Sequence, residues 1–195
     1  MKNLLKNLPE DISGKTVLVA GGASGTGRDI TITLASKGAR VMILDENHDD
    51  VDQTMSDLRS VDCESNCYGM VADLANPNDI KIILSVIDRH FRGIDILINN
   101  NMFTFPKYAG NSERNLQESL YSKLKGQFIC TKELLKRMEK KGKQGYVVNL
   151  NTTGKDLRRQ LININNQVKE AFRTFNSQLC QEAANKNVRV VLSTI

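Results

Sequence analysis

Long apolar stretches, a secretion signal and repeated segments are all absent from this chain of 195 residues. No segment approaches the roughly 18 consecutive apolar residues that a membrane-spanning helix requires. Residues 1–9 contain lysines but lack the apolar core of a signal or an anchor. We find no internal repeat, low-complexity tract or linker. We therefore expect a single cytoplasmic domain over residues 1–195, with no membrane partner.

The cysteines and histidines lack the spacing of a metal site. Zinc sites need closely paired cysteine or histidine ligands, whereas the cysteines here are scattered and only His48 and His90 are available to join them. We therefore expect free thiols and no bound metal. The cysteines are Cys63, Cys67, Cys130 and Cys180.

The excess of positive charge is small, with a formal net charge of +5. The densest basic segment, residues 132–143, falls late in an expected long helix. Cations interact favourably with the negative end of the helix dipole at that position. This accounts for the basic segment without a nucleic-acid partner, and we expect none.

A glycine-rich turn follows a short apolar segment near the start of the chain. Residues 15–20 have the composition of a buried parallel strand, and residues 28–37 have apolar residues at helical spacing. The turn between them contains Gly21, Ser24, Gly25, Thr26 and Gly27. Glycine lets the backbone approach a pyrophosphate, and the N–H groups that begin the helix attract an anion. A glycine cluster also fits an ordinary tight turn, so the context has to decide.

The context is a second apolar strand, residues 40–44, that ends in Asp45. This carboxylate follows the glycines by about 20 residues, where an acidic group accepts hydrogen bonds from the ribose hydroxyls of a dinucleotide. It would repel the extra phosphate of NADP, and we therefore predict NAD as the cofactor. Asp45 also fits the start of the next helix as an N-cap.

The rest of the chain alternates between strand and helix patterns. Further strands are expected at residues 68–72, 94–98, 146–150 and 188–192, with helices over residues 77–91 and from residue 112 or 113. This alternation predicts an α/β fold with a doubly wound parallel sheet of about six strands, in three α/β/α layers.

The glycine spacing G-x-x-x-G-x-G resembles that of the short-chain dehydrogenase/reductase family. Asp73 and Leu74 match the pair that contacts adenine in that family, and Asn99 with Asn100 matches the first half of its Asn-Asn-Ala-Gly signature. The resemblance implies strand order 3-2-1-4-5-6, with the cofactor crossing the carboxyl ends of the strands. It also implies that Asn99 belongs to the cofactor site.

The resemblance places Asn165 where the family has its catalytic tyrosine, and no tyrosine occurs after Tyr146. The family lysine, which binds the nicotinamide ribose, is matched by Lys169 one helical turn later. An asparagine amide donates a hydrogen bond to a carbonyl oxygen but does not transfer a proton. The general acid–base contribution, roughly 10²- to 10⁴-fold, should therefore be lost.

Two more family positions are changed in this chain. The serine that orients the substrate is matched by Thr152, and the asparagine of the proton relay by Lys123. If Lys123 and Lys169 face one cleft, their two charges favour an acidic ligand. Lys123 and Lys169 also fit ordinary helix-surface positions, and Thr152 fits a turn that ends a strand.

The resemblance extends to assembly and to the end of the chain. Helices over residues 113–141 and 160–185 match the usual dimer surface of the family, which implies a homodimer. Family members continue beyond the strand at residues 188–192 with a lid, a helix and another strand. We therefore expect a substrate pocket that lacks one wall and a sheet edge covered by the terminus or another subunit.

Three functions follow from these observations. The first is an NAD-dependent oxidoreductase with weak or altered turnover of a carbonyl or alcohol substrate. The second is an NAD-binding protein without catalysis that acts in regulation or assembly. The third is a non-redox binder of a small acidic metabolite.

Overall fold

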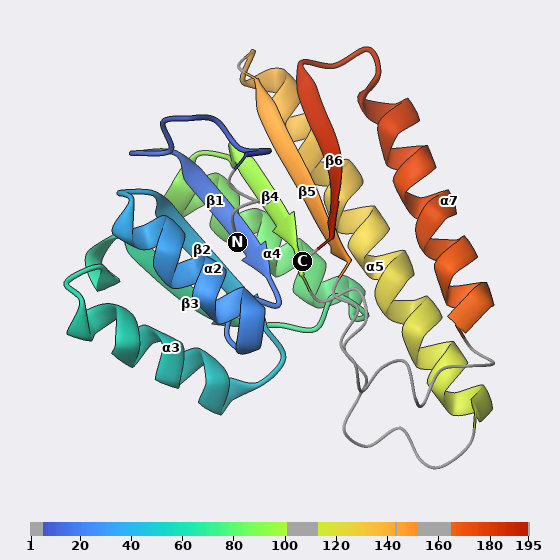
Figure 1. Ribbon diagram of the computed structural model, residues 1–195, viewed down its shortest axis with the longest axis horizontal. Helices are drawn as coiled ribbons and strands as arrows, with labels where there is room; N and C mark the ends of the chain where they lie inside the picture. Colours follow the sequence, from blue (N-terminus) through green and yellow to red (C-terminus); the bar gives the residue numbers. More distant parts are fainter. Residues whose placement is uncertain (1–5, 101–112, 143, 152–164, 195) are drawn as a thin grey trace.

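The computed structural model describes residues 6–100, 113–142, 144–151 and 165–194, which contain a six-stranded parallel sheet (Figure 1). The strands lie in the order β3-β2-β1-β4-β5-β6, and every pairing is parallel. The predicted doubly wound α/β fold and its strand order are therefore confirmed. The strands are β1 (Thr16–Ala20), β2 (Arg40–Asp45), β3 (Cys67–Val71), β4 (Ile96–Asn99), β5 (Gly145–Asn151) and β6 (Val188–Thr194).

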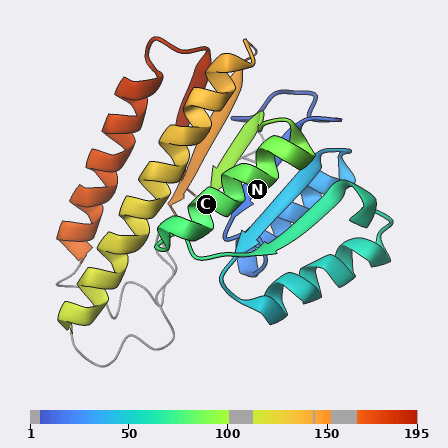
Figure 2. The ribbon, with the colours of Figure 1, turned by 180° about the vertical axis from the view of Figure 1, so that it is seen from behind.

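Helices cover both faces of this sheet. Helices α2 (Gly25–Ser36) and α3 (His48–Ser60) lie on one face. The opposite face, turned to the front in Figure 2, carries α4 (Pro77–Val86), α5 (Glu113–Lys140) and α7 (Asn165–Ala183). A one-turn 3₁₀ helix, η1 (Glu64–Asn66), precedes β3.

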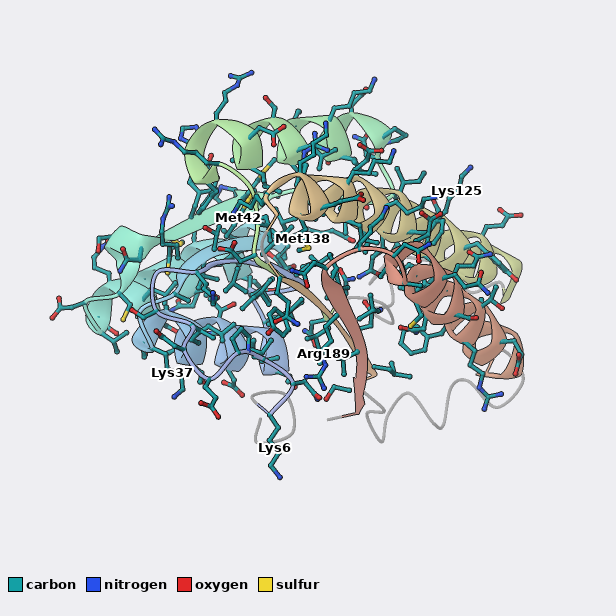
Figure 3. The ribbon with its side chains drawn as sticks, turned by 90° about the horizontal axis from the view of Figure 1, so that it is seen from above. Lys6, Lys37, Met42, Lys125, Met138 and Arg189 are labelled. Carbon is teal, nitrogen blue, oxygen red and sulfur yellow. The ribbon has the colours of Figure 1, made fainter. Side chains whose placement is uncertain are left out.

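The sheet separates two apolar cores because alternate strand residues face opposite sides. On β1, Val17 and Val19 pack with α2 and α3, whereas Leu18 packs with α4, α5 and α7. Figure 3 shows Met42 and Met138 in the interior, and Lys37 and Lys125 at the surface. The central strands β1 and β4 are apolar along most of their length because both of their faces are covered, whereas the edge strand β3 exposes Tyr68 and Val71.

Caps and breaks set the helix boundaries. The side chain of Asn47 caps α3 and that of Asn76 caps α4, where Pro77 occupies the first turn. The helix predicted over residues 77–91 is observed as α4 followed by a π-helical turn, η2 (Ile87–Phe91). Arg92, in a left-handed conformation with φ 54°, ends it.

Strands β3 and β6 form the two edges of the sheet. Within the described ranges, no strand pairs with the outer edge of β6, and the side chain of Leu192 on that strand is exposed. The prediction that another segment or subunit covers this edge therefore stays a prediction. Among the described helices, none combines the length and the apolar character needed to cross a bilayer.

Asp95, directly before β4, connects the amino ends of β1 and β5 through hydrogen bonds. Its carboxylate accepts a hydrogen bond from the Thr16 amide at 2.8 Å and pairs with the Lys141 ammonium at 3.0 Å. The backbone carbonyl of Asp95 accepts a hydrogen bond from the backbone amide of Tyr146, the second residue of β5. Burial raises the pKa of Asp95, but the bonds from Thr16 and Lys141 outweigh burial and hold that pKa below its ordinary value of 3.8.

We predict that Asp95→Asn removes an acid-sensitive part of the stability. A carboxyl with a depressed folded-state pKa stabilises the fold above its unfolded pKa, and this contribution is lost as the pH falls through the folded-state pKa. The variant should unfold with a free energy about 1 kcal/mol lower near pH 7, because the pair with Lys141 is partly exposed. Urea unfolding of both proteins at several pH values measures this difference, which should shrink below pH 3.8. A difference that is constant with pH would contradict the assignment.

Candidate functional site

The glycine-rich turn lies at the carboxyl end of β1 and is held in place from β2 and both flanking helices. The amides of Gly21 and Gly22 donate to the Leu44 carbonyl at 2.8 and 3.1 Å. The hydroxyl of Thr31 on α2 donates to the Gly22 carbonyl at 2.9 Å, and that of Thr54 on α3 donates to the Ala23 carbonyl at 2.8 Å. Carbonyl groups of the turn are thus bonded inside the protein, while Ser24 and Gly25 are exposed.

Two of the glycines are required by geometry. Gly21 has φ 72°, which side chains disfavour. A Cβ on Gly27 would overlap the carbonyl oxygen of Gly21, so the first turn of α2 lies directly against the strand end. Among the described residues, no side chain caps the start of α2, and its first turn carries no acidic residue. The uncapped N–H groups of this helix start can bind an anion.

The Asp45 carboxylate joins the turn to the end of β2. It accepts hydrogen bonds from the backbone amides of Ala23 at 3.2 Å, Glu46 at 2.9 Å and Asn47 at 3.3 Å. Asn47, not Asp45, is the N-cap of α3, so the alternative role considered for Asp45 as the cap is not observed. A carboxylate has about four acceptor positions, so these three bonds leave capacity for a ribose hydroxyl.

Asn99, the last residue of β4, and Asn100, which follows it, have different surroundings. The Asn99 side chain is 1% exposed and bonds to Thr131 and Asn149 in the interior. The Asn100 side chain instead donates to the Gly21 carbonyl at 2.9 Å. Its Oδ1 atom is buried and has no hydrogen-bond partner among the described residues.

Asn100 is therefore the functional candidate that our reading of the sequence missed. We predicted Asn99 for the cofactor site, whereas the side-chain amide that contacts the glycine turn is that of Asn100. The family signature contains both residues. The alternation of side chains along a strand could have shown that only one of them points toward the turn, because consecutive residues point in opposite directions. A buried acceptor without a donor is costly, which favours a ligand hydroxyl or a water at this position.

The predicted adenine pair, Asp73 and Leu74, lies in a tight turn after β3. The amide of Asp73 donates to Asp79 on α4 at 2.9 Å, and the Asp73 carboxylate accepts from the Ala75 amide at 2.7 Å. A Cβ on Gly126 of α5 would overlap the Leu74 carbonyl oxygen. The turn is thus held between α4 and α5, with Leu74 buried and Asp73 half-buried.

Lys123 on α5 forms an ion pair with Glu46, the residue after Asp45. Its ammonium lies 2.8 Å from Oε1 and 2.9 Å from Oε2 of Glu46, and its side chain is only 12% exposed. This ion pair links α5 to the end of β2 and neutralises the cation on which the acidic-ligand hypothesis partly depended. Lys169 supplies the other cation of that hypothesis, and its side chain lies outside the described residues.

The remaining predicted catalytic residues are placed only in part. Thr152 lies outside the described residues, directly after β5. Asn165 and Lys169 lie in the first turns of α7, where the structure describes the backbone and not their side chains. The helix nevertheless puts these two positions one turn apart on one face.

The part of the chain that the structure describes contains no cluster of three or more potential metal ligands. The four cysteines named above are unpaired. Burial raises the pKa of Cys130 to about 12 and that of Cys67 to about 11, so neither thiol is a nucleophile at neutral pH.

Comparison with known proteins gives matches along most of the chain. Residues 15–194 match the family model described as short chain dehydrogenase. The chain is 26% identical over 143 residues to chlorophyll(ide) b reductase NOL from Oryza sativa subsp. japonica, which covers 72% of this chain and 42% of that protein. It is 30% identical over 143 residues to the short chain dehydrogenase/reductase dpmpG from Macrophomina phaseolina, covering 72% and 81%.

A solved structure of 2-keto-3-deoxy-D-gluconate dehydrogenase from Streptococcus agalactiae superposes with a TM-score of 0.77 at 22% identity, covering 98% of this chain and 71% of that one. At this identity the likeness concerns the fold. The chain spans about half the length of the first curated relatives that it matches.

We predict that Gly27→Ala destabilises the protein by about 1–3 kcal/mol, because the added Cβ has to displace the backbone of Gly21. Gly142→Ala is the matched control. Gly142 has a φ of 65° but open space around it, so that change should cost about 1 kcal/mol of conformational strain alone. Urea unfolding measures both costs. A cost at Gly27 no larger than that at Gly142 would show that the turn is not tightly packed.

Proposed function

The chain belongs to the short-chain dehydrogenase family, and on that premise we propose that it binds NAD and interconverts a carbonyl and an alcohol group. The observation that carries the proposal is the glycine turn, closed against α2 and tied by Asp45 to the end of β2. The uncapped start of α2 and the unpartnered oxygen of Asn100 are two further features that fit a bound dinucleotide.

In this proposal, different residues bind different parts of the cofactor. The start of α2, with Ser24, Thr26 and Gly27, binds the pyrophosphate. Asp45 accepts from the adenosine ribose, while the turn at Asp73 and Leu74 borders the adenine.

Glu46 adds a second carboxylate beside Asp45 and is held there by Lys123. A 2′-phosphate would meet both negative charges, although Lys123 offsets one of them. This arrangement favours NAD over NADP.

The proposed chemistry depends on residues at the other end of the crevice. Bound NAD supplies the hydride acceptor, and its reduced form the donor. Lys169 holds the nicotinamide ribose, while Thr152 and Asn165 donate hydrogen bonds that polarise the substrate carbonyl. Asn165 does not deliver the proton, so the chain's turnover is slow or uses a different proton source.

The absence of a tyrosine after Tyr146 favours a second candidate function. In this alternative the protein binds NAD without turning it over and acts in regulation or assembly. We do not propose the third function, binding of a small acidic metabolite, because the described Lys123 ammonium is paired with Glu46.

We also propose that α5 and α7 form a homodimer contact. An apolar groove of about 670 Å³ runs between these helices and is bordered by Leu124, Phe128 and Phe175. Tyr121 at its border is 56% exposed, although it is a large aromatic residue. A symmetric contact would cover this groove on both subunits.

We predict that the protein binds NADH about tenfold or more tightly than NADPH, as measured by fluorescence titration. Asp45→Asn should reduce that preference, because it removes the charge and keeps an oxygen that can accept from the turn. Asp45→Ala would also break three backbone hydrogen bonds and is a poorer test. Asp52→Asn, the same change of charge at an exposed position of α3, is the control. Equal affinities in the wild type would contradict the proposed specificity.

We predict that Asn165→Tyr raises the rate of NADH oxidation with aldehydes and ketones by about 10²-fold or more, because it adds a proton donor one turn before Lys169. Asn165→Phe supplies the ring without the hydroxyl and should show no gain. A gain in the tyrosine variant alone would support the oxidoreductase. No gain in either variant, with NADH binding unchanged, would favour the non-catalytic alternative.

A further inference from the structure

A continuous chain of buried amide groups crosses the interior from β4 to α7. The Nδ2 atom of Asn99 donates to Oγ1 of Thr131 on α5 at 3.3 Å and to Oδ1 of Asn149 on β5 at 2.7 Å. Asn149 donates in turn to Oδ1 of Asn176 on α7 at 2.7 Å, and Asn176 donates to the Phe172 carbonyl at 2.8 Å. The four side chains are 8% exposed or less, so these bonds are shielded from water.

The bond between Asn149 and Asn176 is a buried polar contact between α7 and the sheet, unlike the partly exposed ion pair that joins Glu182 of α7 to Lys132 of α5. In the part of α7 whose side chains are described, the other buried residues are apolar: Phe172, Phe175, Leu179 and Ala183. Apolar contacts tolerate small rotations and shifts of a helix, because they are not directional. A buried hydrogen bond between two amides tolerates neither, because an amide group that loses its partner in the interior is strongly penalised.

The position of Asn176 on α7 relates this bond to the proposed catalytic residues Lys169 and Asn165. Asn176 follows Lys169 by seven residues and Asn165 by eleven, which are close to two and three full helical turns. The three residues therefore lie on one stripe of α7. On the other side of the bond, Asn149 precedes Thr152 by three residues on the strand that leads to it.

From this juxtaposition we infer that the Asn149–Asn176 bond is a positioning device for the nicotinamide end of the site. It fixes the rotation and height of α7 against β5, and thereby the placement of Lys169 relative to the end of that strand. Asn99 and Thr131 hold Asn149 in the orientation that the bond requires. The inference rests on the proposed NAD binding and assigns the positioning role to Asn149 and Asn176.

Comparing two ligands distinguishes positioning from general stability. ADP contains the adenosine and pyrophosphate parts of NADH and lacks both the nicotinamide and the ribose that Lys169 is proposed to bind. The ratio of the two affinities therefore isolates the contribution of the nicotinamide end. Loss of stability alone leaves that ratio unchanged in the folded protein, whereas misplacement of Lys169 lowers it.

The test measures NADH and ADP affinities by calorimetry for the wild type and Asn176→Leu. We expect the variant to bind NADH about tenfold more weakly, with ADP affinity changed less than twofold. Leu179→Val is the matched control, because it also disturbs the buried face of α7 but leaves the amide bond intact. It should lower the melting temperature without changing the ratio. If Asn176→Leu does not fold, Asn176→Thr, which keeps an oxygen acceptor on a shorter side chain, takes its place.

The outcomes separate this inference from the function on which it rests. A wild type that binds neither ligand overturns the proposed function and the inference together. A wild type that binds both equally, or a variant with the wild-type ratio, overturns the positioning role and leaves nucleotide binding intact. An equal change of the ratio in Leu179→Val would also count against it, because any disturbance of α7 would then have the same effect.

Discussion

The site depends first on one carboxylate that gathers three backbone amides. Asp45 binds the amides of Ala23, Glu46 and Asn47, and so joins the glycine turn to the end of the neighbouring strand. Charge-assisted bonds of this kind are stronger than bonds between neutral groups. The close approach of Gly27 to Gly21 is possible only with the turn in this conformation. Asp45, which is proposed to bind the ribose, is thus also the residue that holds the phosphate-binding turn in place.

The two faces of the sheet contribute different parts of the proposed nucleotide site. The turn and the start of α2 come from one face, whereas α5 and α7 come from the other. Contact between these parts is made at the carboxyl ends of the strands, by Asn100 against Gly21 and by Lys123 against Glu46. Both contacts join residues that are more than 70 positions apart in the sequence. A dinucleotide in the proposed position would lie along this line of contacts.

The fold could be predicted from the sequence because its signals are local. Buried parallel strands appear as short apolar runs, and the alternation of strands and helices leaves few possible topologies. The end of α4 was less predictable, since a π-helical turn has the same apolar spacing as the helix it follows. The glycine spacing and the strand that follows it predicted the turn and Asp45, and the family resemblance predicted the pair at Asp73 and Leu74.

The side-chain partners could not be predicted in the same way. The sequence indicated that Lys123 was unusual, but its pairing with Glu46 depends on how α5 lies over the turn after β3. The choice between Asn99 and Asn100 depends on the direction of each side chain at the end of β4. The bond between Asn149 and Asn176 joins a strand to a helix, and neither residue belongs to a motif that we recognised.

The separation of Asp45 from the buried amide chain has an evolutionary consequence. Asp45 stabilises the half of the sheet around β1 and β2, whereas Asn99, Asn149 and Asn176 stabilise the half around β4, β5 and α7. Substitutions in the second half that keep the contacts of Asn100 with Gly21 and of Lys123 with Glu46 should therefore leave the proposed nucleotide site in the first half undisturbed. If the proposed site is correct, this division would let evolution change the catalytic residues one at a time while the coenzyme-binding half stays intact.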